Sequence, residues 1–195
     1  MLNSYPQELL QQKCQLIVEE VLKQSYVEFG VEDFLLRESD QTQIECRLYF
    51  SNDWEEVFIQ GAGDGPVDAL YTAMVKHFSP TFASLKNVFF DDFVMKVDFK
   101  KTTRKSAAPV CIKLSLKNHS ERNIFFSAQS HSMVGASTAV VVGACEYLIN
   151  AEMAFEELKR LIADDRKRSR IDLVDKYVEK IVSLVGIATY EEIAN

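Results

Sequence analysis

Three glycines alternate with other residues in the segment Gly61-Ala-Gly-Asp-Gly-Pro66, which lies between an apparent strand and an apparent helix. Backbone amides in such a loop, together with the positive end of a helix dipole, can hold an anion. The spacing Gly61-x-Gly63-x-Gly65 matches neither a dinucleotide fingerprint nor a Walker loop, and no Lys-Ser or Lys-Thr pair follows it. Asp64 and Asp68 also place negative charge where an anion would sit. The loop therefore disfavours phosphate.

Asp68 falls in the first turn of the predicted helix, and two roles fit it equally well. Its carboxylate can satisfy free backbone amides and the helix dipole. It can equally receive the ammonium group of a bound amino acid.

Side chains typical of catalysis form no recognisable constellation. His77, His119 and His131 lack metal-ligand spacing, and no nucleophile-elbow glycines surround His131. The pair Asp91-Asp92 falls in an irregular or bulged part of a predicted strand. We expect no catalytic residue, no metal centre and no cofactor, and we interpret His131 as a loop residue in preference to a general base.

The cysteines are scattered along the chain without a Cys-x-x-Cys pair, at Cys14, Cys46, Cys111 and Cys145. Their apolar neighbours favour buried reduced thiols over a disulfide or a metal site.

The glycine loop lies near the end of a strand-strand-strand-helix unit. Alternating or continuous apolar residues predict three antiparallel strands, and helical spacing with Pro66 in the first turn predicts the helix. The expected strands are residues 31–38, 42–50 and 54–60, and the expected helix is 67–78. An amphipathic helix over residues 7–29, with Gly30 as its stop, precedes this unit.

The same order of elements then returns. The second unit comprises strands at 85–100, 109–117 and 122–128 and a small-residue helix at 135–151, with a basic exposed loop at 101–108. Phe58 corresponds to Phe125, Gly61 to Ala128 and Val67 to Val134 at one constant separation. Each unit has one sheet face to bury, so we predict an α+β fold in which two units pack about a pseudo-twofold.

Helical segments flank the repeat. Residues 155–162 continue helical, 164–170 form a charged run typical of a solvated helix junction, and 171–185 carry an apolar stripe. We expect that stripe to pack on the domain itself or on a twin subunit. The predicted division is an N-terminal helix (1–30), a module of two units (31–83 and 84–153) and a C-terminal helical arm (154–195).

Composition narrows the classes of function. The chain has 195 residues, 47% of them hydrophobic, and a formal net charge of -7. A net negative charge disfavours nucleic acid as a partner. The sequence has no secretory signal pattern and no evident run of about 20 apolar residues, so we expect a cytoplasmic protein without a membrane span.

The segment from Gly61 to Tyr71 resembles the glycine-rich stretch, often Gly-x-Gly-Asn-Gly-Pro-Val-Asp-Ala, of the regulatory domain of 2-isopropylmalate and citramalate synthases. In the second unit, the segment from Ala128 to Ser137 and the helix ending at Tyr147-Leu-Ile-Asn150 are similar to the family's second loop and helix. The resemblance covers about residues 31–150. It departs where Ala128 replaces a glycine, Ser132 an aspartate and Val88 an aromatic residue of the pocket wall.

In that family the domain pairs with a twin, and leucine or isoleucine binds at the dimer interface to inhibit a catalytic barrel. The resemblance implies effector contacts at Gly61, Gly63, Gly65, Pro66, Asp68, Ala69, Val88, Ala128, Ser130 and Ser132. The barrel and its metal-binding His-x-His have no counterpart in this sequence.

We therefore expect a non-catalytic, homodimeric regulatory module that binds a branched-chain amino acid or similar effector and acts on a separate partner enzyme. The alternative is a structural dimer or adaptor with a degenerate pocket, and a stand-alone enzyme is the third hypothesis.

Overall fold

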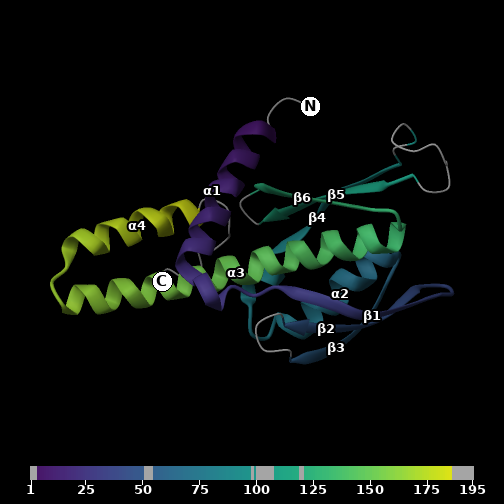
Figure 1. The fold of residues 1–195 in the computed structure, drawn as a ribbon, viewed down its shortest axis with the longest axis horizontal. Helices are drawn as coiled ribbons and strands as arrows, with labels where there is room; N and C mark the ends of the chain where they lie inside the picture. Colours follow the sequence, from purple (N-terminus) through teal and green to yellow (C-terminus); the bar gives the residue numbers. More distant parts are fainter. Residues whose placement is uncertain (1–3, 51–54, 98, 100–107, 119–120, 186–195) are drawn as a thin grey trace.

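The computed structural model describes residues 4–50, 55–97, 99, 108–118 and 121–185 (Figure 1). It confirms the predicted α+β fold, with two separate three-stranded antiparallel sheets of order β1-β2-β3 and β4-β5-β6. The first unit contains β1 (Phe29–Glu38), β2 (Thr42–Phe50), β3 (Glu56–Gly63) and α2 (Pro66–Phe78). The second contains β4 (Val88–Val97), β5 (Val110–Asn118), β6 (Asn123–Ser130) and α3 (Met133–Lys167). Outside the repeat lie α1 (Ser4–Leu22) and α4 (Ile171–Val185), with short 3-10 turns at Lys23–Ser25 and Ala83–Lys86.

The two units share an irregularity as well as an order of elements. The register of β1 against β2 shifts between Val31 and Asp33, and that of β4 against β5 shifts between Phe90 and Asp92. A bulge adds a residue to one strand and changes which side chains face the core beyond it. The irregularity expected at Asp91-Asp92 is thus confirmed, and the first strand of the other unit has a matching one.

The helices lie between the sheets. Helix α2 packs on β2 and β3, α3 packs on β5 and β6, and the two helices contact each other, as Figure 1 shows. The fully buried side chains come from both sheets and both helices, among them Ile44, Leu48, Ile59, Leu70, Met74, Ile112, Leu114, Leu116, Ile124 and Leu148. Each contributes about 1.5–3 kcal/mol when it leaves water, so both units depend on this shared core.

Each helix also reaches the first strand of the other unit. The ring of Tyr71 in α2 lies 4.7 Å from that of Phe90 in β4, measured between centroids. In the reciprocal contact, Glu146 of α3 accepts a hydrogen bond from the backbone amide of Phe29 in β1 at 2.5 Å. Two hollows lie near these crossed contacts, one between α2 and β4 and one between α3 and β1.

The N-terminal helix is shorter than predicted. It ends at Leu22 instead of Phe29, Lys23 has a positive φ of 50°, and Gly30 lies inside β1 instead of stopping a helix. Phe29 belongs to the sheet because its ring packs 5.0 Å from those of both Phe50 and Phe78. Tertiary burial therefore overrides the helical spacing of this segment.

The fourth strand begins later than predicted, at Val88 instead of Leu85. Glu152 of α3 accepts hydrogen bonds from the amides of Ala83 and Ser84, and the Ser84 hydroxyl donates to the carbonyl of Leu148. These contacts hold the preceding segment in a 3-10 turn. Trp54 and Lys100, predicted strand ends, and residues 101–107 of the predicted basic loop lie outside the described residues.

Helix α3 continues without interruption for 35 residues, across the boundary expected between residues 153 and 154. By length and composition alone it is apolar enough to cross a membrane, which corrects the expectation that no such stretch exists. Its most apolar window is 67% buried inside the protein, as in the core helix of a globular domain. Such a helix is weak evidence for a membrane span.

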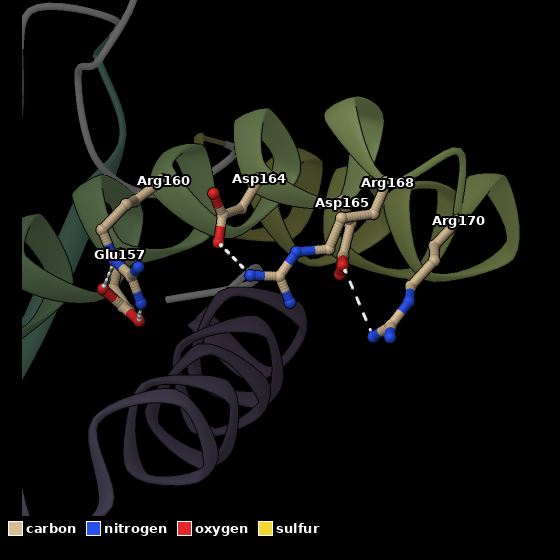
Figure 2. A network of polar contacts seen from close by, with 6 residues as sticks. All are labelled: Glu157, Arg160, Asp164, Asp165, Arg168 and Arg170. Atoms are coloured by element: carbon tan, nitrogen blue, oxygen red, sulfur yellow. Dashed lines mark hydrogen bonds and ion pairs between the residues drawn. The ribbon is translucent and has the colours of Figure 1, made fainter.

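The charged run 164–170 forms the end of α3 and the turn into α4, as expected of a helix junction. Figure 2 shows its ion pairs, Asp164 with Arg168 at 3.3 Å and Asp165 with Arg170 at 3.8 Å, and the pair of Glu157 with Arg160 at 2.6 Å in the preceding turns of α3. Most of these side chains are exposed, so each pair contributes about 1 kcal/mol or less. Helix α4 then returns along α3 and also contacts α1, where Lys180 pairs with Glu20 at 2.8 Å.

Candidate functional site

The glycine loop separates into a packed part and an open part. Gly61 and Gly63 are the last alternate residues of β3, opposite Ile44 and Thr42 of β2. A Cβ atom on Gly61 would lie 2.6 Å from the carbonyl oxygen of Ala69, and one on Gly63 would lie 2.6 Å from the Ala69 amide nitrogen. These two glycines therefore allow α2 to lie directly on β3. A Cβ on Gly65 would meet no atom within 4 Å.

Asp68 is half-buried in the first turn of α2 and Pro66 occupies the start of that helix, as predicted. The Oδ2 atom of Asp68 accepts a hydrogen bond from the backbone amide of Asp64 at 3.0 Å. The first of its two predicted roles, satisfying a free amide, is thus observed. This bond uses one carboxylate oxygen, which leaves the other as a potential acceptor.

A cavity of about 450 Å³ opens at this end of α2. Its walls are Gly65, Pro66, Val67 and Asp68 of the loop and α2, Phe90, Asp91, Asp92, Phe93 and Met95 of β4, and Met133 and Ser137 of α3. The volume suits a small metabolite. Beyond the bulge in β4, Phe93 and Met95 pair with Leu114 and Ile112 of β5, which places them on the helix side of the sheet.

Among the described residues, the lining carries carboxylates and no basic side chain. Asp91 is engaged at its Oδ2 by the Asn123 side-chain amide at 2.9 Å, and Asp92 accepts from the backbone amide of Phe93 at 2.8 Å. A neutral or positively charged polar group on an apolar body matches this arrangement, whereas a phosphate would be repelled.

The remaining predicted effector residues do not reach the cavity. Ala69 is fully buried on the face of α2 that lies against β3. Val88 lies in the core, where its carbonyl accepts from the Tyr71 hydroxyl at 3.3 Å. Ala128 lies in β6 opposite Ile112 of β5. The wall facing α2 comes from β4 beyond Val88, at Phe90 to Met95, so the expected lining from Ala128 to Ser132 and by Val88 is not observed in this cavity.

The second loop instead caps a helix. The Ser132 hydroxyl accepts from the amide of Gly135 at 3.2 Å, and the Ser130 hydroxyl accepts from the amide of Ser132, also at 3.2 Å. Such bonds satisfy free donors at a helix start and stabilise it. Ser130 and Ser132 thus have a structural role in α3.

Sequence reasoning missed the apolar wall formed by Phe90, Phe93, Met95 and Met133. The available signal was the irregularity at Asp91-Asp92, since a bulge there reverses the alternation and turns Phe93 toward the helices.

Other reactive side chains lie apart from this cavity. His131 is an exposed residue of the loop before α3, as interpreted above, and His119 lies outside the described residues. Cys14, Cys46 and Cys145 are buried and Cys111 is half-buried, all as free thiols. Burial raises the pKa of Cys14 and Cys46 to about 11. Within the described part of the chain, no three His, Cys, Asp or Glu side chains are grouped to hold a metal ion.

The fold defines a duplicated α+β domain in which strand and helix of opposite units enclose a small cavity. No protein-family model matches this chain, and the search of curated proteins found no relative. The site itself and the resemblance of the glycine loop are therefore the guides to function.

Proposed function

We propose that this protein is a non-catalytic regulatory module that binds a branched-chain amino acid or a similar small effector in the cavity between α2 and β4. The observation that carries the proposal is the position of Asp68 beside an apolar wall of Phe90, Phe93 and Met95. An α-ammonium group fits the Asp68 carboxylate, and a branched aliphatic side chain fits the aromatic wall.

The α-carboxylate of such an effector needs a donor, because the described residues of the lining include no basic side chain. The first-turn amides of α2 have no acceptor within their own helix, and the helix dipole favours a negative charge there. Asp91 also lines the cavity and accepts from the Asn123 side-chain amide at 2.9 Å, so its charge disfavours a carboxylate placed beside β4. The effector would therefore lie along the start of α2.

Calorimetry with leucine, isoleucine, valine and their keto acids tests the proposal. Asp68→Asn should weaken amino-acid binding by about 1.5–3 kcal/mol, because it removes a charge-assisted hydrogen bond. The asparagine oxygen can still accept from Asp64, so the fold should persist. Asp64→Asn is the matched control, since it removes the same charge from the neighbouring loop position outside the cavity lining. If Asp68→Asn and Asp64→Asn bound the amino acids with equal affinity, Asp68 would not be an effector-binding residue.

The alternative, a structural dimer or adaptor, also has a specific observation in its favour. Strand β4 is an edge strand, and its Phe93, Met95 and Val97 side chains are 39%, 41% and 42% exposed. An apolar edge of this kind is usually covered, and a second copy of the chain would cover it while closing the cavity.

We therefore propose a homodimer under either alternative. Sedimentation at micromolar concentration should give twice the 22.2 kDa mass of the chain. A dimer that binds none of the amino acids would favour the adaptor, whereas a monomeric species at all concentrations would contradict both forms of the proposal. A separate partner enzyme belongs only to the proposal of a regulatory module and not to the adaptor alternative.

A further inference from the structure

A second hollow, of about 470 Å³, lies between β1 of the first unit and α3 of the second. Its walls are Phe29, Val31 and Phe34 of β1, and Val134, Gly135, Thr138, Ala139, Val142, Gly143 and Glu146 of α3. We call it the β1–α3 groove. Phe34 follows the bulge in β1 as Phe93 follows the bulge in β4, so the groove is the counterpart of the effector cavity in the other unit.

Small side chains make the room. Gly135, Ala139 and Gly143 recur at every fourth position of α3 and therefore share one helix face. Ala139 is exposed, and a Cβ atom added to Gly143 would meet nothing within 4 Å. The groove is thus open space beside a flat helix surface.

Glu146 is the only ionisable side chain among the described residues of this lining. Its Oε1 atom accepts from the Phe29 amide at 2.5 Å, while no lysine, arginine or histidine of the described residues forms an ion pair with it. A partly buried carboxylate without a cation is costly, because burial penalises its charged form. A cation entering the groove would relieve that cost.

We propose that the β1–α3 groove binds a small primary amine with an apolar body, its ammonium group donating to Glu146 and its hydrocarbon lying between Phe34 and Ala139. Charge complementarity selects an amine over an acid of the same size, and the apolar walls select it over a metal ion or a polyamine. This site is independent of the effector cavity, since the two linings share no residue.

Binding should depend on pH through Glu146. The pKa of this carboxyl is raised to about 7 as the net result of burial, which raises it most, of the bond from Phe29, which lowers it, and of the neighbouring Glu28, which raises it. Tyr26 and Cys145, the other titratable groups that interact with it, stay protonated because their pKa values are raised as well. Protonated Glu146 cannot pair with an ammonium, so affinity should fall by about tenfold or more between pH 8 and pH 5.5.

The probe is 3-methylbutylamine, followed by calorimetry and by amide chemical shifts, with 3-methylbutanol and 3-methylbutanoate as neutral and anionic controls. We expect the amine to shift the amides around Val31, Phe34 and Ala139 and to bind at least about tenfold more tightly than either control. Glu146→Gln, which keeps an acceptor for Phe29, should lose about tenfold in affinity and all of the pH dependence. Ala139→Leu should block the groove by bulk alone.

Three results would overturn the proposal: equal binding of the alcohol and the amine, unchanged binding by Glu146→Gln, or shifts confined to residues around Asp68. The last would assign the amine to the effector cavity. Asp68→Asn separates the two sites, because it should leave the shifts around Ala139 in place whether or not the effector proposal holds.

Discussion

The loops that lead into α2 and α3 occupy equivalent positions in the two units but have diverged in chemistry. In the first, glycines let the helix lie against the strand and Asp68 faces a cavity. In the second, Ser130 and Ser132 build a cap, Ala128 stands where the first unit has Gly61, and Gly135 stands where it has Asp68. The carboxylate of the second unit's hollow is instead Glu146, several turns further along α3. The two units thus share an architecture but place the carboxylate of each hollow at a different position.

The largest expected difference between the two loops concerns close packing. Gly61→Ala should destabilise the domain by about 2–4 kcal/mol, because the new methyl group would overlap the backbone of α2 at Ala69 and Ala73. The equivalent Ala128→Gly should cost about 1 kcal/mol or less, mainly through backbone entropy. Urea unfolding followed by circular dichroism measures both.

Gly65→Ala is the control for this comparison, since its backbone is extended and no atom lies within 4 Å of the added carbon. Because Gly65 is the N-cap of α2, its replacement by alanine should cost about 0.5–1 kcal/mol, well below the loss expected for Gly61→Ala. If Gly61→Ala were equally mild, α2 would not depend on the close approach that the glycines allow.

The two carboxylates of the hollows should also differ in how they affect stability. The pKa of Glu146 is raised to about 7 in the folded state from an ordinary 4.5, so the folded protein holds this proton more tightly than the unfolded chain. Stability should therefore fall as pH rises through 4.5 to 7, by about 1–2 kcal/mol after allowance for partial solvent exposure. Glu146→Gln should flatten this part of the profile and be the more stable protein at pH 8.

Denaturant midpoints measured between pH 5 and pH 8 test this expectation. Asp68→Asn serves as the comparison, because it removes a carboxylate that borders the other cavity and should leave the slope in this window unchanged. A Glu146→Gln variant that retains the full slope would place the titrating group elsewhere.

Much of the fold could be predicted from the sequence because strand alternation and the repeat are local patterns. The bounds of β2 and α4 agree with the prediction at both ends, at Thr42–Phe50 and Ile171–Val185. The end of the first helix was wrong because Phe29 joins an aromatic cluster with Phe50 and Phe78, which are distant in sequence. A helical pattern cannot reveal such a contact.

The candidate site was predictable on one side only. The loop from Gly65 to Asp68 carries its own signal in turn chemistry and charge. The facing wall of Phe90 and Phe93 depends on how the second sheet crosses to the first helix, a relation set by packing between units. Val88 is implied as a wall residue only by the family resemblance, and the structure buries it in the core instead.

The smallest expected effect contrasts the caps of the two helices. Ser132 caps α3 through its hydroxyl, whereas Gly65 caps α2 without a side-chain hydrogen bond. Ser132→Ala should cost about 1 kcal/mol because the Gly135 amide loses its acceptor, while Ser132→Gly should cost only a few tenths, since glycine lets water reach the free amides. Thermal unfolding of both variants measures the difference, with Ser183→Ala as a control that removes an exposed hydroxyl bonded within α4. No loss of stability in either variant would mean that the Ser132 hydroxyl contributes nothing to the cap, and that the second loop is held by Ser130 and the strand β6 alone.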